Sequence, residues 1–468
     1  MEWYHIRGGI PLRGEYSVKG AKNAALPVLA ASVCRSGVHE ICGCPRIGDV
    51  RWMTEILEVL GARCQWEEDR LMVDSRRLDS AQVPRELMAK MRSSVFLMGS
   101  LLMRTGEAEI WRPGGCRIGK RPVDIHIDGL RCLGFEVREE EEKIVCRGTC
   151  RGGRYVLPYP SVGATENLMM AALSGDSLTV LENCAMEPEI ADLQGFLRTL
   201  GYSVAGAGGR TILVEGAGRS DCSTGRDTMY FIMEDRIEAA TYLMALAGTG
   251  GKGVLSGIRS IYLTSVLEVL EQMGCRIRSF EDRIALEAPR RLQSPGCVVT
   301  APYPGFPTDC QPQLLTLAAC AEGRTRIREE IFESRFSHKK ELAKMGANIE
   351  TSGKNAIIKG ITSLLGAEVC AQDLRGGAAL VLAGLMAEGT TAVTGIEHIE
   401  RGYETLEQGL RELGGNIEKH DERKTKETEK PAAEAGGSSS DRRGVSGVSV
   451  FPDVSDHELS GGGKQLLF

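Results

Sequence analysis

The sequence predicts an α/β protein with two domains, built from six repeats of about 70 residues, three in each domain. A short phrase, Leu or Met followed by Gly, recurs at intervals of 73, 67, 73, 72 and 68 residues. Its glycines are Gly61, Gly134, Gly201, Gly274, Gly346 and Gly414. Each phrase follows a helical pattern, and five of the six precede a second run of β-forming residues. Chance recurrence of a common dipeptide is the alternative, and the matching surroundings argue against it.

Each repeat has the pattern helix, strand, helix and hairpin. Amphipathic helices such as DVRWMTEILEVL end at the repeated glycine, which suits a left-handed residue just after a helix. The strands that complete the hairpins are RLMVDS, KIVCRG, TILVEG, RIALEA and NAIIKG. The other helices are apolar nearly all round and should be buried: ENLMMAALSG, RIEAATYLMALAG, QLLTLAACAEG and AALVLAGLMAEG. We therefore expect an inside-out α/β barrel in each domain, with helices inside and sheets outside.

The last repeat lacks a second strand, because the chain turns polar after LGGNIEK, whereas the N-terminus has two spare strands, WYHIRG and GEYSVKG. The N-terminal strands should therefore close the C-terminal domain. The chain would cross between domains near Lys19–Lys22 and Thr228–Glu234, which makes a hinge possible. The expected parts are residues 1–21 plus 232–418, residues 22–231, and a charged, Gly/Ser-rich disordered tail over residues 419–468. The apolar island VSGVSVFPDV in this tail is either a docking peptide or inert.

Composition excludes several classes of protein. A net charge of −6 at pH 7 argues against general nucleic-acid binding. No apolar run approaches the ~20 residues of a membrane span, and the start, MEWYHIRGG, lacks a signal-peptide layout. The fifteen cysteines therefore indicate reduced thiols in a cytoplasmic protein. The close cysteine pairs at Cys42 and Cys44, and at Cys146 and Cys150, lack partner pairs at zinc-site spacing, so we expect no metal.

A set of motifs resembles one family of transferases. The motifs are GGIPLRGEYSVKGAKNAALPVLAA, PGGCRIGKRPVDIH, PSVGATEN, FPTDCQPQ, IFESRF, DLRGGAALVLAG and HIERGYE. Together, and in this order up to about Ile417, they are similar to the UDP-N-acetylglucosamine 1-carboxyvinyltransferases of the EPSP synthase superfamily. The resemblance implies transfer of the enolpyruvyl group of phosphoenolpyruvate to the 3-hydroxyl of UDP-N-acetylglucosamine, with release of phosphate. This reaction begins peptidoglycan precursor synthesis and needs no cofactor.

The resemblance also implies the residues of the site. Its catalytic residues would be Cys116, Asp309 and Lys22: a thiol that delivers a proton to the vinyl carbon, a base for the sugar hydroxyl, and a cation for phosphoenolpyruvate. The cations beside Cys116 should lower the pKa of its thiol, and the glycines around it should let the loop move. The remaining substrate-binding residues would be Asn23, Arg92, Arg121, Pro122, Val123, Asp124, Ile125, Ser161, Val162, Gly163, Ile331, Phe332, Arg335, Arg375 and Arg401.

Simpler interpretations exist for each residue taken alone. Cys116 could be a stray surface thiol, Lys22 a solvated side chain and Asp309 a cap or loop residue. At the level of the whole protein, 5-enolpyruvylshikimate-3-phosphate synthase shares the reaction type but lacks the GGC loop. A non-catalytic sensor of nucleotide sugars is the other alternative. The combination of Lys22, Cys116, Asp309 and Arg401 favours the enzyme, with the nucleotide sugar binding first and promoting closure of the domains.

Overall fold

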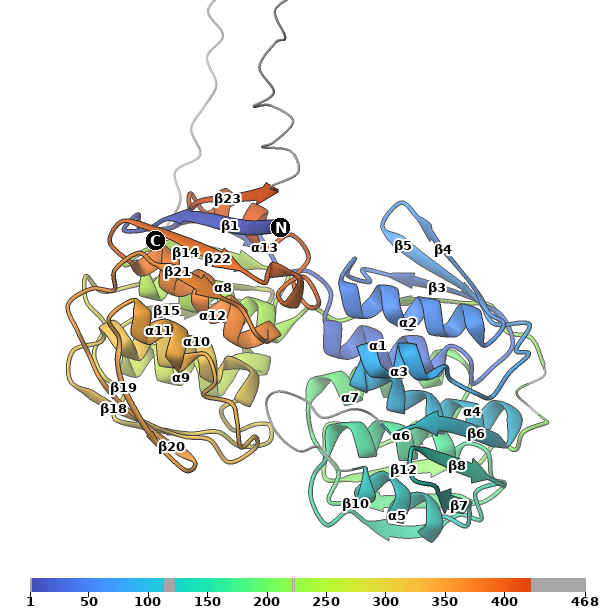
Figure 1. The fold of residues 1–468 in the computed structure, drawn as a ribbon. Coiled ribbons are helices and arrows are strands. Elements are labelled where there is room, and N and C mark those ends of the chain that lie inside the picture. Colours follow the sequence, from blue (N-terminus) through green and yellow to red (C-terminus); the bar gives the residue numbers. More distant parts are fainter. Residues whose placement is uncertain (1, 113–122, 221, 223, 422–468) are drawn as a thin grey trace, which may run out of the picture. The chain divides into compact units, whose positions relative to one another are not determined.

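The computed structural model describes residues 2–112, 123–220, 222 and 224–421, and one compact unit spans Met1–Glu422 (Figure 1). The described chain is an α/β protein in which buried helices pack against mixed sheets. No helix within these ranges is long and apolar enough to cross a bilayer. The predicted tail, apart from its first three residues, lies outside the described residues.

Two separate hydrophobic cores form within this unit. The first takes its buried residues from positions 21–232, and the second from positions 4–18 and 237–417. The chain thus passes between cores close to both crossings expected from the sequence. The two passages lie side by side, because Gly20 and Glu234 form an antiparallel bridge and the Asp235 N–H donates to the Lys19 carbonyl at 2.8 Å. The division into two domains remains a prediction.

Each core is built on a set of helices. In the first core these are α1 (Lys22–Ala31), α2 (Gly48–Val59), α3 (Arg85–Lys90), η1 (Arg92–Phe96), α4 (Leu97–Thr105), α5 (Asp124–Cys132), α6 (Val162–Ala172) and α7 (Pro188–Thr199). In the second they are α8 (Arg236–Gly248), η3 (Ser260–Leu263), α9 (Thr264–Gln272), η4 (Thr308–Cys310), α10 (Gln311–Cys320), α11 (Lys339–Lys344), α12 (Leu374–Met386), η5 (Ile396–His398) and α13 (Leu406–Glu412). The four helices predicted to be buried are α6, α8, α10 and α12, and burial on nearly every face confirms the prediction. Of these, α8, α10 and α12 pack against one another.

The first core carries three sheets. Their strands, in spatial order, are β13 (Thr228–Phe231), β3 (Val38–Cys42), β5 (Arg70–Asp74) and β4 (Arg63–Glu67); β11 (Val204–Ala205), β12 (Thr211–Glu215), β10 (Leu178–Glu182) and β9 (Gly153–Val156); and β6 (Glu107–Trp111), β8 (Lys143–Arg147) and β7 (Glu136–Glu139). The hairpins predicted from RLMVDS, KIVCRG and TILVEG are confirmed as the antiparallel pairs β4–β5, β7–β8 and β11–β12.

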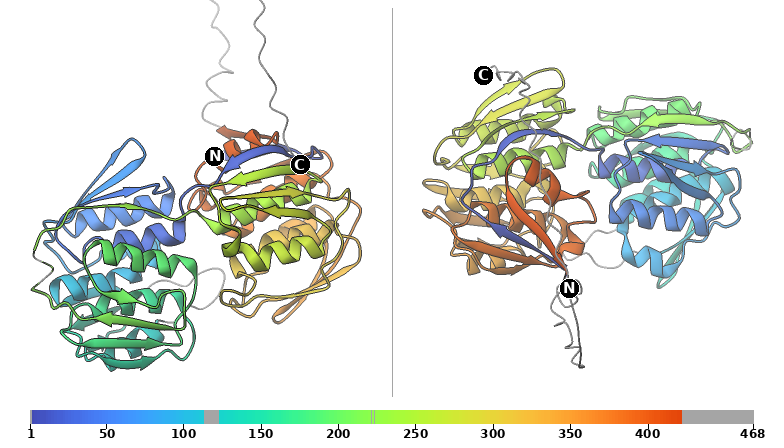
Figure 2. Two further views of the ribbon diagram at one scale, coloured as in Figure 1. Left: turned by 180° about the vertical axis from the view of Figure 1, so that it is seen from behind. Right: turned by 90° about the horizontal axis from the view of Figure 1, so that it is seen from above.

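The second core also carries three sheets. Their strands, in spatial order, are β15 (Arg276–Ser279), β16 (Arg283–Glu287), β14 (Lys252–Ser256) and β2 (Arg13–Ser17); β17 (Cys297–Val299), β18 (Arg324–Arg328), β20 (Asn355–Lys359) and β19 (Asn348–Ser352); and β21 (Glu368–Cys370), β22 (Thr390–Thr394), β1 (Glu2–Arg7) and β23 (Asn416–Asp421). The N-terminal strands complete two of these sheets, as expected: β1 lies between β22 and β23, and β2 pairs with β14. In Figures 1 and 2 the blue strand β1 lies among the orange and red C-terminal strands.

All six repeat glycines adopt the predicted left-handed conformation, with φ between 82° and 112°. At Gly61 a Cβ atom would lie 2.7 Å from the Asp79 amide nitrogen, so the turn has room only for glycine. The tail begins later than Lys419, where it was expected. Strand β23 extends to Asp421 because Glu2 pairs with Asp421 across the sheet and His420 stacks on Trp3 with ring centres 5.4 Å apart.

Candidate functional site

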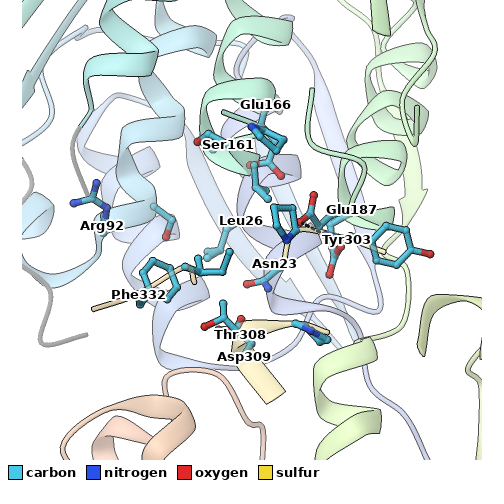
Figure 3. A pocket seen from close by; sticks show the side chains of 18 of the residues that line it. Asn23, Leu26, Arg92, Ser161, Glu166, Glu187, Tyr303, Thr308, Asp309 and Phe332 are labelled. Carbon is cyan, nitrogen blue, oxygen red and sulfur yellow. Dashed lines mark hydrogen bonds between the residues drawn. The ribbon is translucent and has the colours of Figure 1, made fainter. Parts of the chain in front are cut away.

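A cavity of about 640 Å³ is lined by side chains from both cores (Figure 3). It collects most of the predicted site residues, namely Lys22, Asn23, Arg92, Val123, Ile125, Ser161, Val162, Gly163, Asp309, Ile331, Phe332 and Arg401. Three of the predicted residues do not line it: Asp124, Arg335 and Arg375. Both of these arginines contact Asp309. Cys116, Arg121 and Pro122 lie outside the described residues.

Two predicted cations share one carboxylate in this cavity. The Lys22 Nζ lies 2.7 Å from Asp49 Oδ2, and the Arg401 Nε lies 2.9 Å from Asp49 Oδ1. Lys22 is the first residue of α1, and its backbone N–H donates to Asp235 Oδ2 at 3.1 Å. Asp49 comes from the first turn of α2. A charged corner is therefore assembled from three segments that are far apart in the sequence.

Burial and charge set the protonation of this corner. Burial lowers the pKa of Lys22, and the nearby guanidinium groups of Arg375 and Arg401 lower it further, while Asp49 opposes them. Burial would raise the pKa of Asp49, but Lys22 and Arg401 outweigh it and lower that pKa below its ordinary value. Asp49 is thus an anion that opposes the loss of the Lys22 proton. A bound phosphate or carboxylate would act on Lys22 in the same direction.

The loop that carries Arg401 is fixed to the N-terminus of α2. The Gly48 N–H donates to the Glu400 carbonyl at 3.0 Å, and the Arg46 N–H donates to Glu404 Oε2 at 2.9 Å. The Arg401 guanidinium also lies 5.2 Å from the ring centre of Trp52, within cation–π range. These contacts orient Arg401 toward Asp49 and the cavity.

Asp309 is held between two guanidinium groups. Its Oδ1 lies 2.6 Å from Arg335 Nη2, and its Oδ2 lies 3.5 Å from Arg375 Nη2. Arg335 also donates from Nε to the Thr308 carbonyl at 3.1 Å, which fixes η4 against the loop after β18. Both arginine side chains are only 3% exposed.

The N-terminus of α6 forms a second polar corner. The Ser161 side chain accepts from the Ala164 N–H at 3.4 Å, and a Cβ at Gly163 would crowd the ring of Phe96 at 3.1 Å. The Asn167 Nδ2 donates to His126 Nδ1 at 2.9 Å, which leaves Nε2 of the ring as the protonated nitrogen. Burial, and then the charge of Arg92, lower the pKa of His126 to about 4. The helix N-terminus, Arg92 and a neutral imidazole donor suit a diphosphate.

Sequence reasoning missed several residues of the cavity. The chief ones are Asp49, His126, Glu166, Glu187, Glu189, Arg236 and Tyr303. Asp49 resembles an ordinary acidic residue in the first turn of a helix. Glu166 gave a usable signal, because it is a charged residue on a helix that is otherwise apolar nearly all round. Within the described ranges, no group of three or more His, Cys, Asp or Glu side chains is arranged to hold a metal ion.

Comparisons with known proteins agree with the resemblance inferred from the motifs. The family model described as EPSP synthase (3-phosphoshikimate 1-carboxyvinyltransferase) matches residues 6–410. UDP-N-acetylglucosamine 1-carboxyvinyltransferase 2 of Caldanaerobacter subterraneus subsp. tengcongensis is 46% identical over 418 residues, which cover 89% of this chain and 99% of the relative. UDP-N-acetylglucosamine 1-carboxyvinyltransferase 1 of Symbiobacterium thermophilum is also 46% identical, over 89% of this chain and 95% of its own. The resemblance is confirmed.

Solved structures share the fold at lower identity. The enolpyruvyl transferase NikO from Streptomyces tendae superposes with a TM-score of 0.79 at 24% identity, covering 89% of this chain and 98% of its own. EPSP synthase from Acinetobacter baumannii superposes with a TM-score of 0.68 at 20% identity, covering 90% and 100%. At these identities the likeness establishes the fold alone.

Proposed function

The chain belongs to the EPSP synthase family, and from this premise we propose that it transfers the enolpyruvyl group of phosphoenolpyruvate to the 3-hydroxyl of UDP-N-acetylglucosamine and releases phosphate. The chain is then a transferase that begins peptidoglycan precursor synthesis in the cytoplasm. The observation that carries the proposal is a single cavity that holds the Lys22–Asp49–Arg401 corner, the bracketed Asp309 and the N-terminus of α6. These three features suit, in turn, an anionic donor, a sugar hydroxyl and a diphosphate.

Charge divides the two substrates between the features of the cavity. The phosphate and carboxylate of phosphoenolpyruvate would bind Lys22 and Arg401, with Arg121 as a further cation carried over from the family motif. The UDP group would lie along Val123, Ile125 and the α6 N-terminus, and Ile331 with Phe332 would cover its apolar surface. The sugar is then directed toward Asp309, whose carboxylate would be oriented by Arg335 and Arg375.

The reaction would proceed by addition and elimination. The 3-hydroxyl oxygen forms a bond to C2 of phosphoenolpyruvate while its proton passes to the Asp309 carboxylate. The vinyl carbon C3 takes up a proton, which the family resemblance assigns to Cys116, and a tetrahedral ketal phosphate results. Loss of a proton from C3 then re-forms the double bond as the C2–O bond to phosphate breaks. Lys22 and Arg401 would stabilise the negative charge on the leaving phosphate.

The two hydrophobic cores would act as domains that close on the substrates. The domains would be residues 1–21 plus 232–418 and residues 22–231, each an inside-out barrel of three repeats. Closure would turn about the paired passages at Gly20 and Glu234. The proposal is supported by the lining of the cavity, which both cores supply. Ordered binding predicts tighter phosphoenolpyruvate binding once UDP-N-acetylglucosamine is present.

The test is phosphate release from phosphoenolpyruvate with either acceptor. We expect turnover with UDP-N-acetylglucosamine and none with shikimate 3-phosphate; the reverse result would identify the chain as a 5-enolpyruvylshikimate-3-phosphate synthase. Asp309→Asn should lower kcat by about 10²- to 10⁴-fold while nucleotide-sugar binding persists. Asp282→Asn is the matched control, because this carboxylate is 68% exposed, outside the cavity, and pairs only loosely with Arg283 at 3.7 Å. Undiminished turnover in Asp309→Asn would remove the assigned base.

Covalent labelling tests the assignment of Cys116. Fosfomycin, an epoxide phosphonate that mimics phosphoenolpyruvate, should modify Cys116, and faster with UDP-N-acetylglucosamine present. Peptide mass mapping provides an internal control in the exposed thiols of Cys132, Cys297 and Cys370. Labelling at these three cysteines but not at Cys116 would contradict the assignment. Binding of the nucleotide sugar without any turnover would instead favour a non-catalytic sensor.

A further inference from the structure

Three glutamates form an acid wall along one side of the cavity: Glu166, Glu187 and Glu189. Glu166 projects from α6 one turn beyond Val162 and Gly163, whereas the other two flank Pro188, the first residue of α7. In the view of Figure 3, Glu166 is drawn near Ser161 and Glu187 near Tyr303, and Arg92 is at the opposite edge of the view. The reaction steps above use none of these carboxyl groups.

Glu166 is the unusual member of the acid wall. Its side chain is completely buried, and neither carboxyl oxygen has a hydrogen-bond partner among the described residues. An unpaired buried carboxylate is far costlier than the neutral acid. Burial raises the pKa of Glu166 well above its ordinary value, and the neighbouring carboxylates of Glu189 and Glu187 raise it further. In its neutral form the group has an O–H donor without an acceptor among the described residues.

The other two members present acceptors. Glu189 Oε1 pairs with Arg236 Nε at 2.9 Å, and Oε2 has no partner in the described part of the chain. Glu187 Oε1 accepts from the Tyr303 N–H at 3.3 Å, and its Oε2 is likewise without a partner there. The acid wall is not arranged as a metal site. It thus offers one donor and two acceptor oxygens to something uncharged in the cavity.

We infer that the acid wall is a subsite for the uncharged part of the acceptor sugar, and that Glu166 donates a hydrogen bond to a neutral oxygen of that sugar. This inference rests on the proposed function. A sugar hydroxyl and an N-acyl carbonyl share the required chemistry. Glu166 is then a specificity-determining residue that the motifs did not reveal.

Two substitutions at Glu166 separate donation from packing. Glu166→Gln keeps the shape and an N–H donor, and should bind UDP-N-acetylglucosamine within about 3-fold of the wild type by calorimetry. Glu166→Leu removes the donor and should weaken binding by about 10-fold. It should also raise the thermal midpoint of the free protein, because an unsatisfied buried acid is removed. A purely structural Glu166 would give the opposite pair of results: a lower midpoint and unchanged affinity.

The matched control is Asp192→Asn. Asp192 is another acid, partly buried, whose pKa burial raises to about 7, and it does not line the cavity. Its substitution should leave binding of the nucleotide sugar within about 2-fold of the wild type. UDP-glucose, which lacks the N-acyl group, distinguishes the two candidate hydrogen-bond acceptors, the N-acyl carbonyl and a sugar hydroxyl. If the carbonyl accepts, Glu166→Leu should weaken only UDP-N-acetylglucosamine; if a hydroxyl accepts, both nucleotides should weaken equally.

Difference infrared spectroscopy observes the proton directly. Adding UDP-N-acetylglucosamine to the wild type should shift a protonated-carboxyl C=O band, and the band should be missing in Glu166→Gln. No shift in the wild type, or wild-type affinity in Glu166→Leu, overturns the inference. Phosphate release by the wild type separates the proposed function from the inference about Glu166. If the wild type turns over but the band does not shift, or Glu166→Leu binds normally, only the inference about Glu166 is wrong. No binding of either nucleotide sugar to the wild type would overturn both.

Discussion

Asp49→Asn should make catalysis strongly dependent on pH. Asp49 is the counter-ion that Lys22 and Arg401 share, at 2.7 Å and 2.9 Å. Without it, burial and the adjacent guanidinium groups would lower the pKa of Lys22 still further, because the Asp49 charge that opposes them has gone. Lys22 would then lose its proton at a lower pH than in the wild type. The alkaline limb of kcat/KM for phosphoenolpyruvate should move to lower pH.

The size of the expected fall in kcat/KM follows from how exposed the ion pairs of Asp49 with Lys22 and Arg401 are. The side chains of Lys22 and Asp49 are 12% and 3% exposed, so their pair counts as buried, and breaking such a pair costs about 3–5 kcal/mol. Asparagine still offers Lys22 a hydrogen-bond acceptor, which reduces the loss to about 2–3 kcal/mol. Arg401 is 33% exposed, and solvent screening makes its pair a minor term. The expected fall in kcat/KM on the alkaline limb is therefore about 30- to 160-fold.

The assay is steady-state phosphate release as a function of pH, with UDP-N-acetylglucosamine saturating. At acid pH, where Lys22 stays protonated, the variant should lose less than about 3-fold, because its added positive charge still favours the anion. Asp49→Glu should restore part of the alkaline limb. Asp74→Asn is the control, since its 2.7 Å pair with Arg76, whose side chain is 64% exposed, lies outside the cavity. A loss of equal size at every pH, with the limb unmoved, would refute the reasoning.

Three further predictions concern stability. Arg236→Met leaves the Glu189 carboxylate buried without its 2.9 Å partner and should lower the free energy of unfolding in urea by about 3–5 kcal/mol; adding Glu189→Leu should recover most of this loss. Burial raises the pKa of Asp192 from 3.8 to about 7, so its contribution to stability is present at acid pH and is lost as the pH rises toward 7. In Asp192→Asn the free energy of unfolding should therefore fall less steeply with pH over this range. Gly61→Ala, at φ 112° and with a Cβ 2.7 Å from a backbone nitrogen, should lower the free energy of unfolding by about 1–3 kcal/mol in thermal unfolding. Its control, Gly225→Ala, has open space around the Cβ and should lower it by less than about 1 kcal/mol. Equal losses would contradict the conformational argument.

The regular parts of the fold were predictable because they repeat. Alternating apolar residues in hairpin strands such as β5 and β20 indicate one buried face, and the recurrent glycines mark where helices end. The short strands β9, β17 and β21 were not predicted. Each has three or four residues, too few to establish an alternating pattern, and each pairs in parallel with a strand that follows later in the chain. Such pairing is decided by tertiary packing.

The candidate site was predictable only where residue type and motif coincide. Lys22, Asp309 and Arg401 line the cavity as the motifs implied. Asp49 could not be assigned, because its role depends on a partner 352 positions away in the chain, and its local sequence fits an ordinary helix start. Glu166 could be noticed as an acid on an apolar helix, but whether such a group is paired, hydrated or protonated depends on neighbours that only the structure identifies.

Asp49 and Glu166 each reduce the repulsion between like charges in the same cavity, Asp49 among cations and Glu166 among acids. Cations gathered for an anionic substrate would repel one another in its absence, and Asp49 stabilises Lys22 and Arg401 until a phosphate arrives. Acids gathered around an uncharged sugar would also repel one another, and Glu166 avoids this by keeping its proton. Because the loop with Arg401 is hydrogen-bonded to the start of α2, separation of the two cores would break the Arg401–Asp49 pair. Opening of the proposed hinge is thereby coupled to loss of anion affinity, which favours release of phosphate after the elimination step.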